Sequence, residues 1–340
     1  MEKSTKTKRS EKAKKMRIMK KNLKKTMARK NEKSSIMKSL KLSNESLQRK
    51  NVYLTNYVNK VRQRCQSKTG QLTFSSVRLE SKTFLNNMLS SKPTMCTLDS
   101  FRKIISCSSR SGTFGSTYPV NFCKLSGMVV VAKEIDTKLS TPLEISVEAK
   151  VGHLLSGHTN FPFVFGFVNP NIILMQNLGE LTEHGEFSVN TVHDYLYSGT
   201  PLLPSDWLSI SNQILCAISE MHELQILHND IKSNNIIIHR NKTPFIIDFG
   251  KATAVQCPSK YNLSNSQKGK YKRKYPHLAP DLVDGLCAQS VLTDTYSIGF
   301  LFSQIGDAAQ NSKLQKLSPK MMQYFSQERP SLKDAIAFLM

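Results

Sequence analysis

The feature that most constrains this sequence is the run ILHNDIKSNN at 226–235, followed by Asp248 in the tripeptide DFG. Asp230, Lys232 and Asn235 stand close together in this run, and Asp248 follows Asn235 by thirteen residues. Phosphoryl transfer depends on such groups, because a carboxylate orients the attacking hydroxyl, a Lys contacts phosphate, and side-chain oxygens bind Mg²⁺. Phosphoryl transfer by these groups would require a fold that brings the two segments together.

The two segments resemble the H-R-D-x-x-x-x-N and D-F-G motifs of the eukaryotic-type protein kinases, with Asn229 in place of Arg. The resemblance implies an α+β, bilobal kinase-like fold with a small β-rich N-lobe and a larger, mainly helical C-lobe. It implies that Asp230 and Lys232 are catalytic. It further implies that Asn235 and Asp248 bind the metal, and that ATP and Mg²⁺ are the cofactors.

The stretch SRSGTFGSTY resembles the glycine-rich loop with which kinases cover the phosphates of ATP. Gly112 and Gly115 match its second and third glycines and Phe114 its tip, while Arg110 stands where the first Gly is usual. The resemblance assigns ATP contacts to six residues: Arg110, Ser111, Gly112, Thr113, Phe114 and Gly115. An ordinary hairpin turn containing Gly is the alternative interpretation.

In VVVAK, Lys133 falls at the position of the family's V-A-I-K lysine, which holds the α and β phosphates and pairs with a Glu of the next helix. Glu148 is the expected partner, ahead of Glu144, because HLLSGHTNF after it resembles the segment that follows this helix in the family. Lys133 and Glu148 therefore join the catalytic set. Two differences from the family are Val131, where Ala is usual over the adenine, and Gly152, which should weaken the helix.

The segment NIILMQNLGE resembles the strand and hinge that join the two lobes. Met175 would border the adenine pocket, and the backbone from Gln176 to Leu178 would bind the adenine edge. The resemblance therefore adds Met175, Gln176 and Leu178 to the ATP-binding residues.

Downstream, Asp281 in PHLAPD takes the place of the Glu in the family's A-P-E element, and Arg329 is its expected ion-pair partner. Asp294 in TDTYSIGF is expected to brace the backbone of the catalytic loop. Strand-like alternation predicts three strands between Phe101 and Ile135, and an apolar stripe predicts a helix from Trp207 to Leu227.

In many kinases the Arg before the catalytic Asp holds a phosphate on the activation segment, here residues 248–281. Asn229 is uncharged and lacks the bidentate fork of Arg, so we expect activity that does not depend on phosphorylation of this segment. Its candidate acceptors are Thr253, Ser259, Ser264 and Ser266. A solvated loop is expected for its cations, although they could bind phosphate or an acidic substrate: Lys268, Lys270, Lys272, Arg273 and Lys274.

The resemblance implies an ATP-dependent protein kinase that transfers the γ-phosphate to Ser or Thr hydroxyls of protein substrates. Lys232, two residues after Asp230, is typical of Ser/Thr kinases rather than Tyr kinases. A pseudokinase scaffold, which binds nucleotide or partners without catalysis, is the main alternative, but Lys133, Asp230, Asn235 and Asp248 are all present. A small-molecule phosphotransferase is a second alternative, although DFG, APD and TDTYSIGF would not be expected together in that class.

Charge divides the chain near residue 70. The formal charge is +23, and residues 1–70 hold 23 Lys and Arg against 4 Glu. We therefore expect a basic, helical or disordered arm at 1–70, a linker at 71–97 and a kinase domain at 98–340, with the N-lobe at 98–176 and the C-lobe at 177–340. Such an arm attracts nucleic acid or other polyanions, and its Lys clusters are typical of nuclear import signals.

Within the arm, Leu40, Leu47, Leu54 and Val61 recur every seven residues. A solvated basic helix or a disordered tail is the first interpretation of this segment, and weak coiled-coil self-association through residues 36–64 is the alternative that the pattern indicates. Seven scattered cysteines without a C-x-x-C pair indicate a reducing compartment, and no apolar run approaches the ~20 residues of a membrane span. An intracellular protein, nuclear if the arm directs import, is the expectation.

Overall fold

The structure is a computed structural model that describes residues 82–83, 85–87, 89, 101–103, 110–112, 115–122, 128–168, 171–181, 187–197 and 202–340. The basic arm at 1–70, with its coiled-coil pattern, lies outside these residues, as do Thr113 and Phe114 of the glycine-rich stretch. Within the described part of the chain, no helix is both long enough and apolar enough to cross a membrane.

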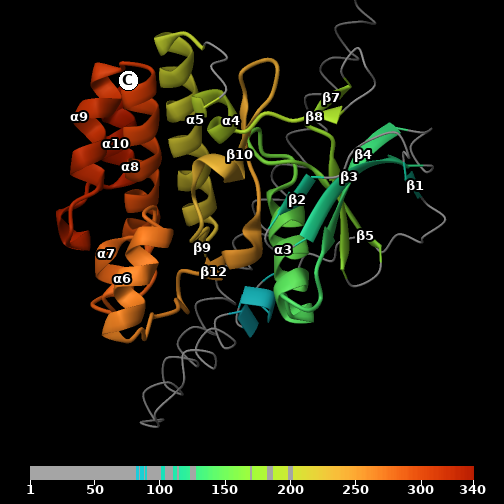
Figure 1. Ribbon diagram of the computed structural model, residues 1–340, viewed down its shortest axis with the longest axis horizontal. Coiled ribbons are helices and arrows are strands. Elements are labelled where there is room, and N and C mark those ends of the chain that lie inside the picture. Colours follow the sequence, from blue (N-terminus) through green and yellow to red (C-terminus); the bar gives the residue numbers. More distant parts are fainter. Residues whose placement is uncertain are drawn as a thin grey trace, which may run out of the picture. The chain divides into compact units, whose positions relative to one another are not determined.

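An antiparallel sheet of six strands forms the first part of the kinase-like region (Figure 1). Its strand order is β1-β3-β4-β6-β5, with β2 also paired to β3. The strands are β1 (Phe101–Lys103), β2 (Arg110–Gly112), β3 (Gly115–Phe122), β4 (Met128–Ile135), β5 (Val164–Val168) and β6 (Ile172–Gln176).

The prediction of three strands from Phe101 to Ile135 is wrong in one respect, because four are present. The first predicted strand consists of two short ones, β1 and β2, which pair with opposite ends of the eight-residue β3. The alternation of side chains could not separate β1 from β2, because the residues of both strands fit one continuous alternating pattern.

Helix α3 (Pro142–Leu155) packs on one face of this sheet, where Ile145 and Ala149 join Ile135, Val164 and Ile173 in a buried cluster. The helix begins with a capping box, in which the backbone N–H of Thr141 donates to Glu144 Oε2 over 2.9 Å.

Gly152 of α3 faces Val164 of β5. A Cβ at Gly152 would lie 2.8 Å from Cγ2 of Val164, so only Gly permits this packing distance. Tertiary packing therefore offsets the low helix propensity of Gly. From the sequence, Gly152 was expected only to weaken the helix, and the close packing explains why Gly occupies this position.

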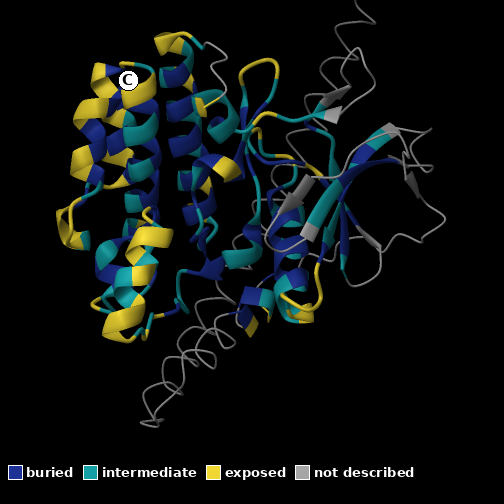
Figure 2. Cartoon of the chain, in the orientation of Figure 1, coloured by how far each residue is buried: buried dark blue, intermediate teal, exposed yellow. Residues whose placement is uncertain are grey.

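The second part is mainly helical. Its helices are α4 (Val192–Tyr197), α5 (Pro204–Glu223), α6 (Asn265–Lys274), α7 (Pro280–Val283), α8 (Val291–Ala308), α9 (Ser312–Met321) and α10 (Leu332–Leu339). Figure 2 shows buried residues where α5 and α8 face one another and exposed residues on the outer sides of α6 and α9. A small sheet region followed by a helical region confirms the bilobal α+β fold.

Short elements lie between these two parts in Figure 1 and carry the polar motifs. They are β7 (Glu180–Leu181), β8 (Phe187–Ser188), β9 (Ile226–Leu227), β10 (Ile236–Ile238), β11 (Pro244–Ile246) and β12 (Thr253–Ala254), with 3₁₀ turns η3 (Ser233–Asn235) and η4 (Phe249–Lys251). A further 3₁₀ turn, η5 (Ser326–Glu328), lies within the helical part between α9 and α10.

The helix predicted from Trp207 to Leu227 starts earlier and ends earlier than expected. Pro204 begins α5, as suits a residue with no N–H to satisfy. The helix ends at Glu223, because Gln225 adopts a left-handed φ of 63° and the chain then enters β9.

The cationic run from Lys268 to Lys274 is helical, which corrects the expectation of a solvated loop. Ser264 caps α6 reciprocally with Gln267, and Lys272 forms an ion pair of 2.7 Å with Asp284. No residue of α6 is buried, so burial of an apolar face does not stabilise this helix. The capping box at its N-terminus stabilises it instead.

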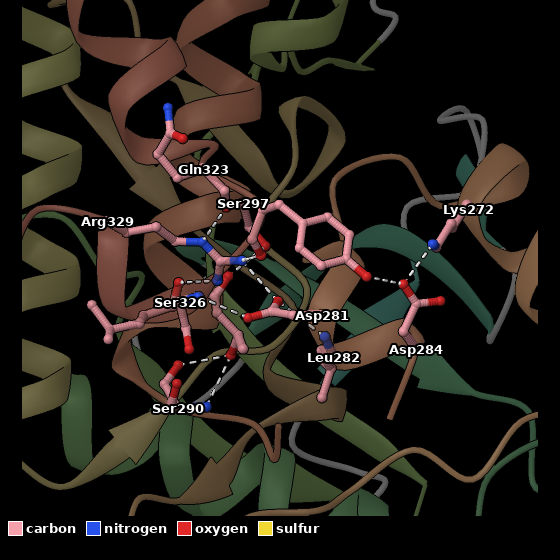
Figure 3. A network of polar contacts seen from close by, with 12 residues as sticks. Lys272, Asp281, Leu282, Asp284, Ser290, Ser297, Gln323, Ser326 and Arg329 are labelled. Carbon is pink, nitrogen blue, oxygen red and sulfur yellow. Dashed lines mark hydrogen bonds and ion pairs between the residues drawn. The ribbon is translucent and has the colours of Figure 1, made fainter. Parts of the chain in front are cut away.

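The predicted ion pair of Asp281 and Arg329 forms in the interior of the helical part. Arg329 Nη2 lies 2.7 Å from Asp281 Oδ1, and both side chains are almost completely buried. Figure 3 shows the guanidinium directed at Asp281 and surrounded by backbone; it also donates to the carbonyls of Leu292, Gln323 and Tyr324. The pair therefore joins α7, at the end of the activation segment, to the turn that precedes α10.

Candidate active site

The loop that carries Asp230 is braced by the buried carboxylate of Asp294 at the start of α8. This carboxylate accepts the backbone N–H groups of His228 and Asn229, each over 2.9 Å, and lies 2.9 Å from His222 Nε2. Asn229 has a left-handed φ of 63°, a conformation that Asn adopts more readily than most residues. The brace fixes the backbone that leads into Asp230.

The Asp230 carboxylate receives hydrogen bonds from two residues of its own loop. Lys232 Nζ donates to Oδ2 over 2.7 Å, and Asn235 Nδ2 donates to Oδ2 over 3.1 Å and to the Asp230 carbonyl over 2.9 Å. The loop side chains named from the sequence are therefore brought together.

A third partner of Asp230 was missed by sequence reasoning. Nε2 of His277 lies 3.0 Å from Asp230 Oδ1, and the imidazole is buried. Burial alone would raise the pKa of Asp230, but the His277 hydrogen bond and the Lys232 charge outweigh it and lower this pKa to about 2. The carboxylate is thus ionised at neutral pH, as a proton acceptor must be.

Lys133 lies between two carboxylates. Its ammonium forms an ion pair with Glu148 of α3 and lies 3.1 Å from Asp248 Oδ1, whereas Glu144 takes part in the helix cap instead. Burial would lower the pKa of Lys133, but the charges of Asp248 and Glu148 outweigh it, so this pKa is raised. Lys133 is therefore a cation that connects β4, α3 and the DFG tripeptide.

The DFG tripeptide is held by its aromatic residue. Phe249 is buried, with its ring centroid 6.1 Å from that of Phe161 and 5.6 Å from that of His228. Asp248 adopts a left-handed φ of 69°, which carries its side chain away from Phe249 and toward Lys133. The buried ring thus anchors the backbone while the carboxylate faces the pocket.

A pocket at this point is lined by residues that include Lys133, Glu148, Asp230, Asp248 and Gly250. A Cβ at Gly250 would lie 3.3 Å from Asp248 Oδ1 and 3.4 Å from Glu148 Oε2, so Gly leaves space beside both carboxylates. Among the residues that the structure describes, the lining of this pocket includes none of the hinge residues Met175, Gln176 and Leu178.

The donor set fits Mg²⁺ bound together with phosphates. Asn235 donates to Asp230 through its amide nitrogen, which leaves the amide oxygen as a hard ligand, and Asp248 supplies a partly exposed carboxylate. Mg²⁺ is usually held by one or two protein carboxylates with water and substrate phosphates, and this arrangement meets that requirement.

The remaining ATP-binding predictions lie in the sheet. Residue pairing joins Arg110 to Thr117, Ser111 to Ser116 and Gly112 to Gly115 in the β2–β3 hairpin. Met175 and Gln176 end β6 opposite Val131 and Val130 of β4, and Leu178 is buried just beyond. These residues thus lie on the hairpin and strand that the resemblance implied, and their contacts with nucleotide stay a prediction.

Residues from the expected linker at 71–97 contact the site. The Nζ of the buried Lys82 donates to the carbonyls of Gly250 over 2.9 Å and Ala252 over 2.5 Å. Asn86 accepts from Ser146 and Lys150 of α3 over 3.1 and 3.0 Å. This segment therefore joins α3 to the DFG tripeptide, and nothing in its Ser-rich composition indicated that role.

Replacing Lys82 with Met should lower the free energy of unfolding by about 2 kcal/mol, because hydrogen bonds to a buried charged group are lost. Thermal unfolding of the full chain measures this as a fall of several degrees in Tm. Lys138→Met, at an exposed position, is the matched control and should leave Tm nearly unchanged. Equal Tm values for both variants would contradict a stabilising role for Lys82.

Comparison with known proteins gives a match to the protein kinase domain family over residues 111–309. The chain is 31% identical to serine/threonine-protein kinase PrkC of Bacillus subtilis over 40% of this chain and 21% of that protein. It is 34% identical to calcium-dependent protein kinase 6 of Plasmodium berghei over 46% of this chain and 10% of that protein. It is 24% identical to GLH-binding kinase 1 of Caenorhabditis elegans, over 56% and 52% respectively. The chain thus spans between a tenth and about half of the length of these relatives.

Proposed function

Since the chain belongs to the protein kinase family, we propose that it is an active enzyme that transfers the γ-phosphate of ATP to Ser or Thr hydroxyls of protein substrates. The observation that carries this proposal is the position of Lys133 between Glu148 and Asp248, in the pocket that Asp230 also lines. A cation for the phosphates, a carboxylate for the metal and a carboxylate for the acceptor are thus within one pocket.

Each residue has a distinct task in this proposal. Mg²⁺–ATP, when bound, would supply the phosphoryl group, with Asn235 and Asp248 holding the metal and Lys133 the phosphates. Asp230, ionised at neutral pH, accepts a hydrogen bond from the substrate hydroxyl and takes its proton as the oxygen attacks. Lys232, beside Asp230, offsets negative charge on the transferred group.

Specificity for Ser and Thr rests on Lys232, which follows Asp230 by two residues as in Ser/Thr kinases. PrkC, one of the relatives, bears the name serine/threonine-protein kinase. Incubating the purified full chain with labelled ATP, Mg²⁺ and a basic protein, followed by phospho-amino-acid analysis, tests both parts of the proposal. Labelled phosphoserine or phosphothreonine is expected. Nucleotide binding without transfer would favour a pseudokinase scaffold, and phosphotyrosine would refute the specificity.

The structure gives a physical reason to expect that activity does not require a phosphorylated activation segment. Asn229 is buried, and its Nδ2 donates to the Lys251 carbonyl over 3.1 Å and to Thr253 Oγ1 over 2.8 Å. Uncharged hydrogen bonds thus connect the catalytic loop to the start of the segment, where many kinases use Arg and phosphate. Thr253 and Ser259 are themselves buried, so of the four candidate acceptors only Ser264 and Ser266 are exposed.

A variant that carries Ser264→Asn and Ser266→Ala should therefore phosphorylate a test substrate at close to the unmodified rate. Asn retains the cap of α6, so the variant removes both exposed hydroxyls without removing the cap. Steady-state rates before and after phosphatase treatment of the wild type give the comparison. A hundredfold loss in either experiment, equivalent to about 2.7 kcal/mol in the activation barrier, would show that a phosphate is required.

A further inference from the structure

His277 places a buried imidazole against the catalytic carboxylate from the far end of the activation segment. It is 6% exposed, and its Nε2 lies 3.0 Å from Asp230 Oδ1, although 47 residues separate the two positions. Ser297 Oγ of α8 donates to the His277 carbonyl over 2.7 Å. The ring of Tyr275 lies edge-on to the imidazole, with 6.3 Å between the two ring centroids. Backbone and ring are therefore both held in place.

The direction of the hydrogen bond follows from the charge of Asp230. Its carboxylate accepts hydrogen bonds from Lys232 Nζ over 2.7 Å and from Asn235 Nδ2 over 3.1 Å, as an ionised carboxylate does. An ionised carboxylate can only accept hydrogen bonds, so Nε2 of His277 must carry the hydrogen.

The two oxygens of this carboxylate are used differently by the described residues. Oδ2 accepts from both Lys232 and Asn235, whereas Oδ1 accepts from His277. A carboxylate oxygen has two lone pairs, so Oδ1 retains one for a further donor. The acceptor hydroxyl can therefore donate to Oδ1 without displacing any of the three side chains.

We propose that His277 is a positioning residue for phosphoryl transfer, which holds Oδ1 of Asp230 in the orientation that receives the hydroxyl of the protein substrate. This inference rests on the proposed kinase function. Lys232 and Asn235 fix one side of the carboxylate from within the catalytic loop, and His277 fixes the other side from the activation segment. Rotation of the carboxylate is thereby prevented, and its orientation depends on correct placement of residues 275–281, which end in the anchored Asp281.

Two substitutions of similar length separate positioning from a general structural role. His277→Gln retains an N–H donor, whereas His277→Met retains bulk and removes the donor. We expect His277→Met to lower kcat for a protein substrate about 10- to 100-fold, since misplacement of a reacting group by about 1 Å has effects of this size. KM for ATP should stay within about twofold in both variants, because the nucleotide-binding residues are unchanged, and Gln should restore most of kcat.

A double-mutant comparison adds a measurement that a structural role would not affect. In a chain that already carries Asp230→Asn, His277→Met should cause little further loss of the residual rate, because His277 acts through the carboxylate that is gone. His239→Phe, in an exposed turn where the ring contacts Asn241, is the control and should leave kcat unchanged. If the Met variant melts below the assay temperature, His277→Phe, which keeps a ring beside Tyr275, replaces it.

The results separate this inference from the proposed function. Unchanged kcat in His277→Met, equal losses in the Met and Gln variants, or losses that add in the double mutant would each overturn the positioning role while the kinase assignment stands. Absence of transfer by the wild-type chain would overturn both. A donor-dependent fall in kcat with unchanged KM for ATP would support the inference.

Discussion

Replacing Asp230 with Asn is expected to lower kcat about 10²- to 10⁴-fold, the range contributed by general acid–base catalysis. Asn has nearly the same shape as Asp, but it carries no negative charge and cannot take a proton from the acceptor hydroxyl. The affinity for ATP and the melting temperature should change little, since Lys133 and Asp248 remain in place. Single-turnover transfer and nucleotide titration measure the two quantities separately.

The control for this experiment is Asp206→Asn, which removes an equivalent charge at an exposed ion pair with Lys242. That variant should retain the wild-type kcat, because solvent weakens ion pairs at the surface and Asp206 lies outside the pocket lining. A rate close to wild type for Asp230→Asn would refute the assignment of Asp230 as the proton acceptor.

Replacing Arg329 with Met should lower the free energy of unfolding by about 3–5 kcal/mol, the cost of leaving one member of a buried ion pair without its partner. Asp281 would lose its guanidinium partner while keeping the backbone donors of Leu282 and Ser326, and three carbonyls would also lose the guanidinium. For a folded region of this size, Tm should fall by about 10 °C or more. Differential scanning calorimetry of the full chain measures the change.

Lys242→Met is the matched control, because it breaks the exposed pair with Asp206 and should leave Tm nearly unchanged. Similar Tm values for the Arg329 and Lys242 variants would show that the buried pair does not stabilise the fold. A double variant, Asp281→Leu with Arg329→Met, should recover part of the loss, since it leaves neither charge unpaired.

The fold was predictable from the resemblance to the kinase family, because the motifs that carry the resemblance are short and local. Asp230 and Asn235 stand in one such motif and Asp248 in the next. The pairing of Asp281 with Arg329 was predictable only through family resemblance, because 48 residues separate them.

Contacts that depend on tertiary structure alone could not be read from the sequence. His277 lies in an apolar segment and meets Asp230 only because α8 fixes its backbone. Lys82 is one cation among many in the first hundred residues, and its burial is decided by where the chain crosses α3. Gly152 was assessed by helix propensity, whereas the structure shows that a Cβ at this position would lie only 2.8 Å from Val164 Cγ2.

The activation segment is held at its start by Lys82, which binds the carbonyls of Gly250 and Ala252, and at its end by Arg329, which binds Asp281. Both residues lie outside the 111–309 region that matches the kinase family. A protein shortened to that region would keep every residue of the catalytic loop and yet lose both attachments. A shortened protein made for expression should therefore begin before Lys82 and end after Arg329. The region that matches the kinase family is too short for this purpose, because it leaves out both residues that hold the activation segment.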